Sequence, residues 1–227
     1  MPRPYRHWAP EAIYHVTIRG NDRQHIFLDA ADYRQYLLTV HQSRRKWPYR
    51  LLAFALMPNH VHLVIQVLAD ASPSDAMQWL NVTYTRYFND RHHRVGHLYQ
   101  GRFYSNHIDR DTYAFEVTRY VHLNPVRARL VQHPLEYCWS SYRIYVGEER
   151  DALSLVDREP ILRLFGETTA VQIVAYRQFV EEIAREEQAM VAHARTLRLH
   201  RLIPPRRWLR EKVSEKVSGT FSCSKSA

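Results

Sequence analysis

The sequence predicts an α+β domain with a ferredoxin-like sheet, because segments typical of strands and helices follow one another in the order β-α-β-β-α-β. Apolar side chains alternate in the strand segments and recur every three or four residues in the helical ones. One further helix follows the last strand, and the final third of the chain combines helical spacing with many basic residues. We therefore expect a split β-α-β sheet followed by a helical, basic extension.

The first half of this pattern starts with a strand over 13–19, where apolar and polar side chains alternate. A helix over 29–47 follows, and Asp29 is its expected N-cap. Residues 50–57 form an apolar strand, and a Pro-Asn turn leads into a second strand over 60–67. These segments supply the β-α-β-β part of the pattern.

The second half starts with a helix over 72–90, which opens with a serine cap, a proline and an acidic residue. Residues 97–108 are expected to form a short hairpin or an irregular strand pair around Gly101. Asp109 is then expected to cap the helix that carries Tyr120. This helix completes the part of the chain that the fold pattern explains.

The rest of the chain has a different character. Residues 160–165 and 171–187 have helical spacing, and the second segment has an apolar stripe made of Val171, Val174, Ala175, Phe179 and Ile183. Basic side chains then crowd residues 195–216, and the last residues are polar. We expect a sheet domain over 8–146, a helical basic extension over 147–213 and a disordered tail over 214–227.

Composition narrows the possible partners. The chain has 227 residues, a formal net charge of +9 and a pI of about 9.7, which favours a polyanionic partner, although a basic surface can also serve solubility alone. Its two cysteines cannot build a disulfide framework, so we expect a reducing cytoplasm. No stretch approaches 18 uncharged apolar residues, and we expect neither a membrane span nor a secretory signal.

The segment Met57–Ile65 carries the first chemical motif. Side chains alternate across a strand, so His60 and His62 share one face and Val61 lies on the other. Two imidazoles side by side on a rigid strand can hold one metal ion. A pair of ordinary histidines at a strand end is the alternative interpretation.

The segment Arg119–Ala128 carries the second motif. Tyr120 and Asn124 are four residues apart at the end of a predicted helix, so both belong to one helix face. His122 lies nearly opposite them and is expected to be structural or to touch a nucleic acid. Because Pro125 follows, Asn124 could instead only end the helix.

These two motifs, together with Tyr14–Asn21, Leu98–Phe103 and Trp139–Tyr142, resemble the REP-associated tyrosine transposases, bacterial enzymes of the HUH superfamily with one tyrosine nucleophile. The resemblance covers roughly residues 8–146. It implies metal-dependent cleavage and strand transfer of single-stranded DNA through a 5′-phosphotyrosine intermediate, at repetitive extragenic palindromic hairpins. In this chain it implies Tyr120 as nucleophile and His60, His62 and Asn124 as ligands of Mg²⁺ or Mn²⁺.

Basic and polar residues near these motifs are candidates for DNA contacts. They are Arg19, Asn21, Arg23, Tyr99, Gln100, Arg102, Arg198, Arg206 and Arg207. A solvated rim is the alternative for the first six. The C-terminal arginines could bind DNA, form a solvated surface or occlude the site.

Three rival functions remain open from the sequence. A replication initiator or relaxase-type nickase would use the same chemistry, but such enzymes often have a third histidine in the cluster, which the motif here lacks. A DNA-binding module without catalysis could keep the fold, and a metal hydrolase could use water as nucleophile. The oligomeric state, monomer or dimer, stays open as well.

Overall fold

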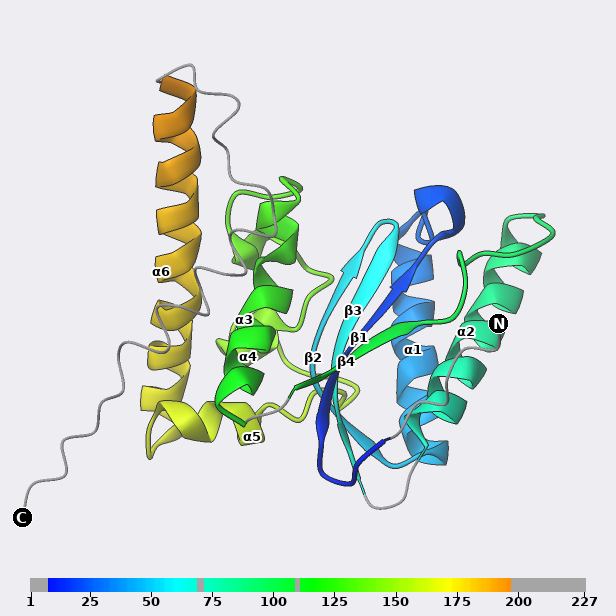
Figure 1. Cartoon of the computed structure of the whole chain (residues 1–227), viewed down its shortest axis with the longest axis horizontal. Coiled ribbons are helices and arrows are strands. Elements are labelled where there is room, and N and C mark those ends of the chain that lie inside the picture. The colour runs from blue at the N-terminus through cyan, green and yellow to red at the C-terminus, as the bar shows by residue number, and fades with distance from the viewer. Residues whose placement is uncertain (1–7, 69–71, 109–110, 197–227) are drawn as a thin grey trace, which may run out of the picture. The chain divides into compact units, whose positions relative to one another are not determined.

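The computed structural model describes residues 8–68, 72–108 and 111–196. Within them lies a four-stranded antiparallel sheet with the strand order β2-β3-β1-β4 (Figure 1). Its strands are β1 (Ile13–Arg19), β2 (Tyr49–Met57), β3 (His60–Val67) and β4 (Tyr104–Ile108). The order of helices and strands and the central position of β1 and β3 confirm the predicted split β-α-β arrangement.

Helices cover both faces of the sheet. Helices α1 (Ala30–Lys46) and α2 (Pro73–Arg91) lie side by side on one face, and α3 (Asp111–Arg127) lies on the other (Figure 1). Asp29 caps α1 as predicted, because its carboxylate accepts hydrogen bonds from two amides of the first turn. The sheet is therefore the middle layer, with a different environment on each side.

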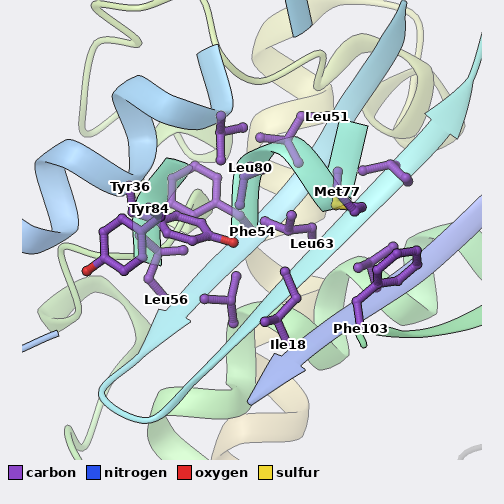
Figure 2. Close-up of a cluster of buried hydrophobic side chains, with 14 of the residues drawn as sticks. Ile18, Tyr36, Leu51, Phe54, Leu56, Leu63, Met77, Leu80, Tyr84 and Phe103 are labelled. Atoms are coloured by element: carbon purple, nitrogen blue, oxygen red, sulfur yellow. The ribbon is translucent and has the colours of Figure 1, made fainter. Parts of the chain in front are cut away.

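The hydrophobic core lies between the sheet and α1 and α2. Tyr36, Tyr84 and Leu80 from the two helices pack against Leu63 and Leu56 of the sheet (Figure 2). Burying one such side chain contributes about 1.5–3 kcal/mol. This burial fixes which face of each strand points inward, and it therefore fixes the direction of the polar side chains on the opposite face.

That opposite face of the two central strands is polar. On β3, Val61, Leu63 and Ile65 belong to the core, so His60 and His62 point to the α3 side, as the alternation predicted. On β1, Val16 and Ile18 belong to the core in the same way, which turns His15 and Thr17 toward α3.

Short elements complete the chain between and after these layers. They are η1 (Asn21–Arg23), η2 (Pro134–Glu136), α4 (Tyr142–Tyr145), α5 (Glu159–Leu162), η3 (Arg163–Phe165) and α6 (Thr169–Thr196). Residues 139–141 pair with β2 through the amides of Leu56 and Ser141, so a loop covers this edge of the sheet. No helix among the described residues is long and apolar enough to cross a bilayer.

The structure corrects three local predictions. Residues 97–108 do not form a hairpin, because only β4 is a strand there and its partner is β1, while Tyr99 makes an isolated bridge to Gly20. Ser72 occupies the N-cap position of α2 without a capping hydrogen bond from its side chain. Val171 and Val174 are exposed, because α6 buries the face that carries Tyr176 and Val180 instead.

The chain divides into two compact units after Glu181, within α6. All contacts discussed below belong to the first unit. The predicted domain limits at 146 and 213 stay predictions, although Asp157 already bonds to the backbone of β2 and to Arg44 of α1. The expected cap Asp109, the arginines 198, 206 and 207 and the expected disordered tail lie outside the described residues.

Candidate active site

Three histidines gather on the polar face of the sheet. His60 and His62 come from β3 and their ring centroids lie 4.9 Å apart. His15 comes from β1, and its Nε2 atom lies 2.8 Å from Nδ1 of His62. His15 and His62 are only 9% and 5% exposed, whereas His60 is more open to solvent. His15 thus neighbours the histidine pair, although no group of three His, Cys, Asp or Glu side chains among the described residues is placed to hold one metal ion.

Tyr120 of α3 lies against this histidine cluster. Its ring meets those of His15 and His62 edge-on, with centroids 5.8 Å and 6.0 Å apart. The guanidinium carbon of Arg127, two turns further along α3, lies 5.2 Å from the centroid of the same ring. The structure thus brings together the tyrosine and the histidine pair, which are about sixty residues apart in the sequence.

Asn124 and His122 lie on different sides of α3. The helix continues through Pro125 to Arg127, so Asn124 stays one turn from Tyr120, and its Nδ2 donates to the Tyr120 carbonyl over 2.8 Å. His122 is completely buried, with Nε2 2.8 Å from Ser141 Oγ and Nδ1 2.8 Å from the Tyr176 hydroxyl. Burial lowers the pKa of His122 to about 3. Its burial and its two hydroxyl partners fit the expected structural role, and its side chain has no exposed surface.

Three loops meet where the histidine strand begins. The Gly20 amide donates to the Asn59 carbonyl over 2.9 Å, and the Gln100 amide donates to the Arg19 carbonyl over 3.1 Å. The Asn21 amide bonds to the carbonyl of Leu98. These bonds place five of the predicted DNA-binding side chains at one end of the sheet, beside His60. They are Arg19, Asn21, Arg23, Gln100 and Arg102, and all except the half-buried Arg19 are exposed.

Tyr99 does not belong with these exposed side chains. It packs against the hydrophobic core, its hydroxyl is buried, and this burial raises its pKa above the ordinary value. The half-buried ring and buried hydroxyl make Tyr99 a weaker candidate for base stacking than an exposed ring. Tyr104 of β4 is a better one, because it is 64% exposed. It pairs with Thr17, which pairs with His62, so Tyr104 lies on the same face as the histidines.

The sequence alone offered only weak signals for His15 and Tyr104. His15 lies on the polar side of an alternating strand, but its distance from His62 depends on how β1 aligns with β3. Tyr104 is one of 15 tyrosines, and only the pairing of β4 with β1 places it near the cluster. The pairing register of two distant strands depends on both strands together, so the local pattern of one strand does not show it.

The chain is similar to known transposases in sequence. The family profile described as "Transposase IS200 like" matches residues 9–124, more than half of the chain. A protein of Haemophilus influenzae that carries the name REP-associated tyrosine transposase is 24% identical over 155 residues, which cover 63% of this chain and 87% of that protein.

A solved structure has a similar fold. It is described as a REP-associated tyrosine transposase bound to a REP hairpin, and it aligns with a TM-score of 0.55 and 16% identity. The alignment covers 70% of this chain and 98% of the other. At this identity the likeness concerns the fold alone, but the family profile includes both the histidine strand and Tyr120. The chain therefore belongs to the family of IS200-like transposases.

Proposed function

We propose that this protein cuts and rejoins single-stranded DNA at hairpin-forming repeats, with Tyr120 as the nucleophile. The observation that carries the proposal is the position of Tyr120, whose ring contacts His15 and His62 on the polar face of the sheet. The similarity to a transposase whose structure contains a REP hairpin supports a hairpin as substrate. Such a substrate would place the enzyme with the DNA in the bacterial cytoplasm.

The reaction exchanges one phosphodiester bond for another. The phenolic oxygen of Tyr120 attacks the scissile phosphorus, a bond forms between them, and the bond from phosphorus to the 3′ oxygen breaks. The proton of the phenol is lost, and the departing 3′ oxygen gains one. The product is a 5′-phosphotyrosine and a free 3′-hydroxyl. A second 3′-hydroxyl can attack the phosphotyrosine in reverse, which explains strand transfer without an external energy source.

His60, His62 and Asn124 would hold a divalent cation such as Mg²⁺ or Mn²⁺. Among the described residues no group of three or more His, Cys, Asp or Glu side chains could hold a metal, so the two imidazoles need other oxygen ligands. The Asn124 amide and the DNA phosphate would supply them. A bound cation would offset the charge that develops on the phosphate. Nδ2 of Asn124 donates to the Tyr120 carbonyl, so Oδ1 is the side-chain atom that could bind a cation.

The DNA would lie over the exposed end of the sheet. Arg19, Arg23 and Arg102 would contact phosphates, and Asn21 and Gln100 offer hydrogen bonds nearby. Tyr104 lies two strands from His62 on the same face, about 10 Å away at ordinary strand spacing, so it could stack one unpaired base next to the scissile phosphate.

A labelled hairpin oligonucleotide tests this proposal. The protein, Mn²⁺ and DNA should give a species that survives denaturation and carries label from the 5′-phosphate side of the cut. Addition of a second strand with a 3′-hydroxyl should release that label as a joined product. EDTA, His60→Ala and His62→Ala should remove cleavage while hairpin binding persists. Cleavage without any covalent species would instead identify a hydrolase, and binding without cleavage would identify a DNA-binding module.

The basic C-terminal residues can be tested separately. Arg198, Arg206 and Arg207 lie outside the described residues, and their role in DNA binding stays a prediction. Removal of residues 197–227 should weaken DNA binding. For each lost phosphate contact, the slope of log K against log salt should fall by roughly 0.7. An unchanged slope would show that these side chains only solvate the surface, and faster cleavage would show that they occlude the site.

A further inference from the structure

Each of the two histidines on β3 is held at its Nδ1 atom by a neighbouring side chain. His60 Nδ1 lies 2.6 Å from Asn59 Oδ1, and His62 Nδ1 lies 2.8 Å from His15 Nε2. We propose that Asn59 and His15 are positioning residues that keep both imidazoles in the tautomer with the proton on Nδ1 and the lone pair on Nε2. This inference rests on the proposed function, because that tautomer is the one in which Nε2 can bind a cation.

The argument for His60 follows from the neighbours of Asn59. The amide nitrogen of Asn59 donates to the carbonyl of Arg23 over 3.1 Å, and this bond fixes the orientation of the amide. Its oxygen therefore faces His60. Oxygen can only accept in this contact, so Nδ1 of His60 must be the donor. A neutral His60 then carries its lone pair on Nε2.

The argument for His62 concerns which ring donates. His15 and His62 are both buried, and their ring planes are inclined to each other by only 20° with centroids 5.0 Å apart. Because the two nitrogen atoms are 2.8 Å apart, they lie between the two ring centres, as an N–H···N hydrogen bond requires. Thr17 Oγ1 is a weaker candidate partner, because it lies 3.4 Å from the same Nδ1. If His62 donates, His15 accepts through Nε2, and both histidines of β3 share one tautomer. If His15 donates, His62 cannot present a lone pair at Nε2.

Such positioning matters because a metal ligand that changes tautomer loses its donor atom. Loss of a side chain that orients a ligand typically weakens metal binding by about 10- to 100-fold. Asn59 has a second connection, since its carbonyl accepts from Gly20 in the loop with the candidate DNA contacts. The same asparagine thus joins the orientation of His60 to the position of that loop.

The first test measures tautomers directly, without metal or DNA. The method is long-range proton–nitrogen NMR of ¹⁵N-histidine-labelled protein at about pH 8, where a typical imidazole is neutral. For both His60 and His62 it should show a protonated Nδ1 and an unprotonated Nε2. His15→Phe should remove this preference at His62 only, and Asn59→Leu should remove it at His60 only. Thr17→Val should change neither. A proton on Nε2 of His62 in the unchanged protein would overturn the assignment.

The second test measures Mn²⁺ binding by calorimetry in the absence of DNA. His15→Phe and Asn59→Leu should each weaken binding by about 10- to 100-fold. His15→Gln and Asn59→Asp keep an oxygen acceptor and should restore most of the affinity, which also controls for misfolding. Equal affinity in all variants would overturn the positioning role. If the unchanged protein shows the expected tautomers but binds Mn²⁺ neither alone nor with hairpin DNA, the metal part of the proposed function fails and the tautomer assignment stands.

Discussion

Helix α3 has a polar cluster on each side, and the two clusters differ in their exposure to solvent and in the groups that contact their histidines. The sheet-facing cluster consists of His15, His60, His62 and Tyr120. The buried cluster consists of His122, Ser141, Tyr176 and Thr118. Both ring nitrogens of His122 have hydroxyl partners within the protein, and its side chain has no exposed surface. In the sheet-facing cluster, Nδ1 of His60 lies against Asn59 and Nδ1 of His62 lies against His15, and His60 and Tyr120 are partly exposed.

The buried cluster allows a complete set of hydrogen-bond directions with a neutral His122, although the Ser141 hydroxyl also lies 3.3 Å from the Phe54 carbonyl. The Phe54 amide donates to Ser141 Oγ, whose hydroxyl can donate to Nε2 of His122. Nδ1 of His122 then donates to Tyr176, and the Tyr176 hydroxyl donates to Thr118. Every polar atom named here is used, so a neutral His122 is stable without water. His122 therefore has a different environment from His60, because the two residues lie on different sides of α3.

The first way to test this contrast is to change Tyr120 itself. Tyr120→Phe deletes one hydroxyl and keeps the ring that contacts His15 and His62. We expect cleavage and the covalent DNA species to fall by several orders of magnitude, because the nucleophile is lost. Hairpin affinity and thermal stability should stay close to those of the unchanged protein. A denaturant-resistant adduct of undiminished yield would assign the chemistry to another residue.

A second test compares Asn124 with His122, which lie on opposite sides of α3. Asn124→Ala should raise the Mn²⁺ concentration for half-maximal cleavage by roughly tenfold or more, with little change at saturating metal. His122→Gln should leave that concentration unchanged, because His122 is buried on the side of α3 that faces Ser141 and Tyr176. The reverse pattern would place the metal on the other side of α3.

The features that follow from local periodicity could be predicted from the sequence. The two-residue repeat of a strand placed His60 and His62 on one face, and the 3.6-residue repeat of a helix separated Tyr120 and Asn124 from His122. His15 was missed as a cluster member, because its place depends on the register between β1 and β3. The partial burial of Tyr99 could not be foreseen for a related reason. Its burial depends on loops that meet only in the folded chain.

A third test removes one hydroxyl from the buried cluster. Tyr176→Phe leaves Nδ1 of His122 without its acceptor in a fully buried position. We expect the free energy of unfolding to fall by about 1–3 kcal/mol in urea denaturation. Tyr113→Phe, at an exposed tyrosine of α3, should change the free energy of unfolding far less. Cleavage at low temperature should be unaffected, and a specific loss of activity would mean that the two clusters are coupled.

The smallest expected effect is a pH dependence of stability that comes from His122. Its pKa is about 3 in the folded protein, because burial disfavours the charged ring, against 6.5 for an unperturbed histidine. Below about pH 6.5 the unfolded chain takes up a proton that the folded protein does not, so the stabilisation present above this pH is lost progressively toward pH 3. Between pH 7.5 and 5.5 this loss should be about 1.4 kcal/mol. Urea denaturation at the two pH values, in the unchanged protein and in His122→Gln, isolates the contribution of His122 as the difference between them. The NMR signals of the His122 ring should also stay unchanged over this range, which needs no variant. A ring that titrates near pH 6.5 in the folded protein would show that water reaches the buried cluster, and the contrast between the two sides of α3 would be lost.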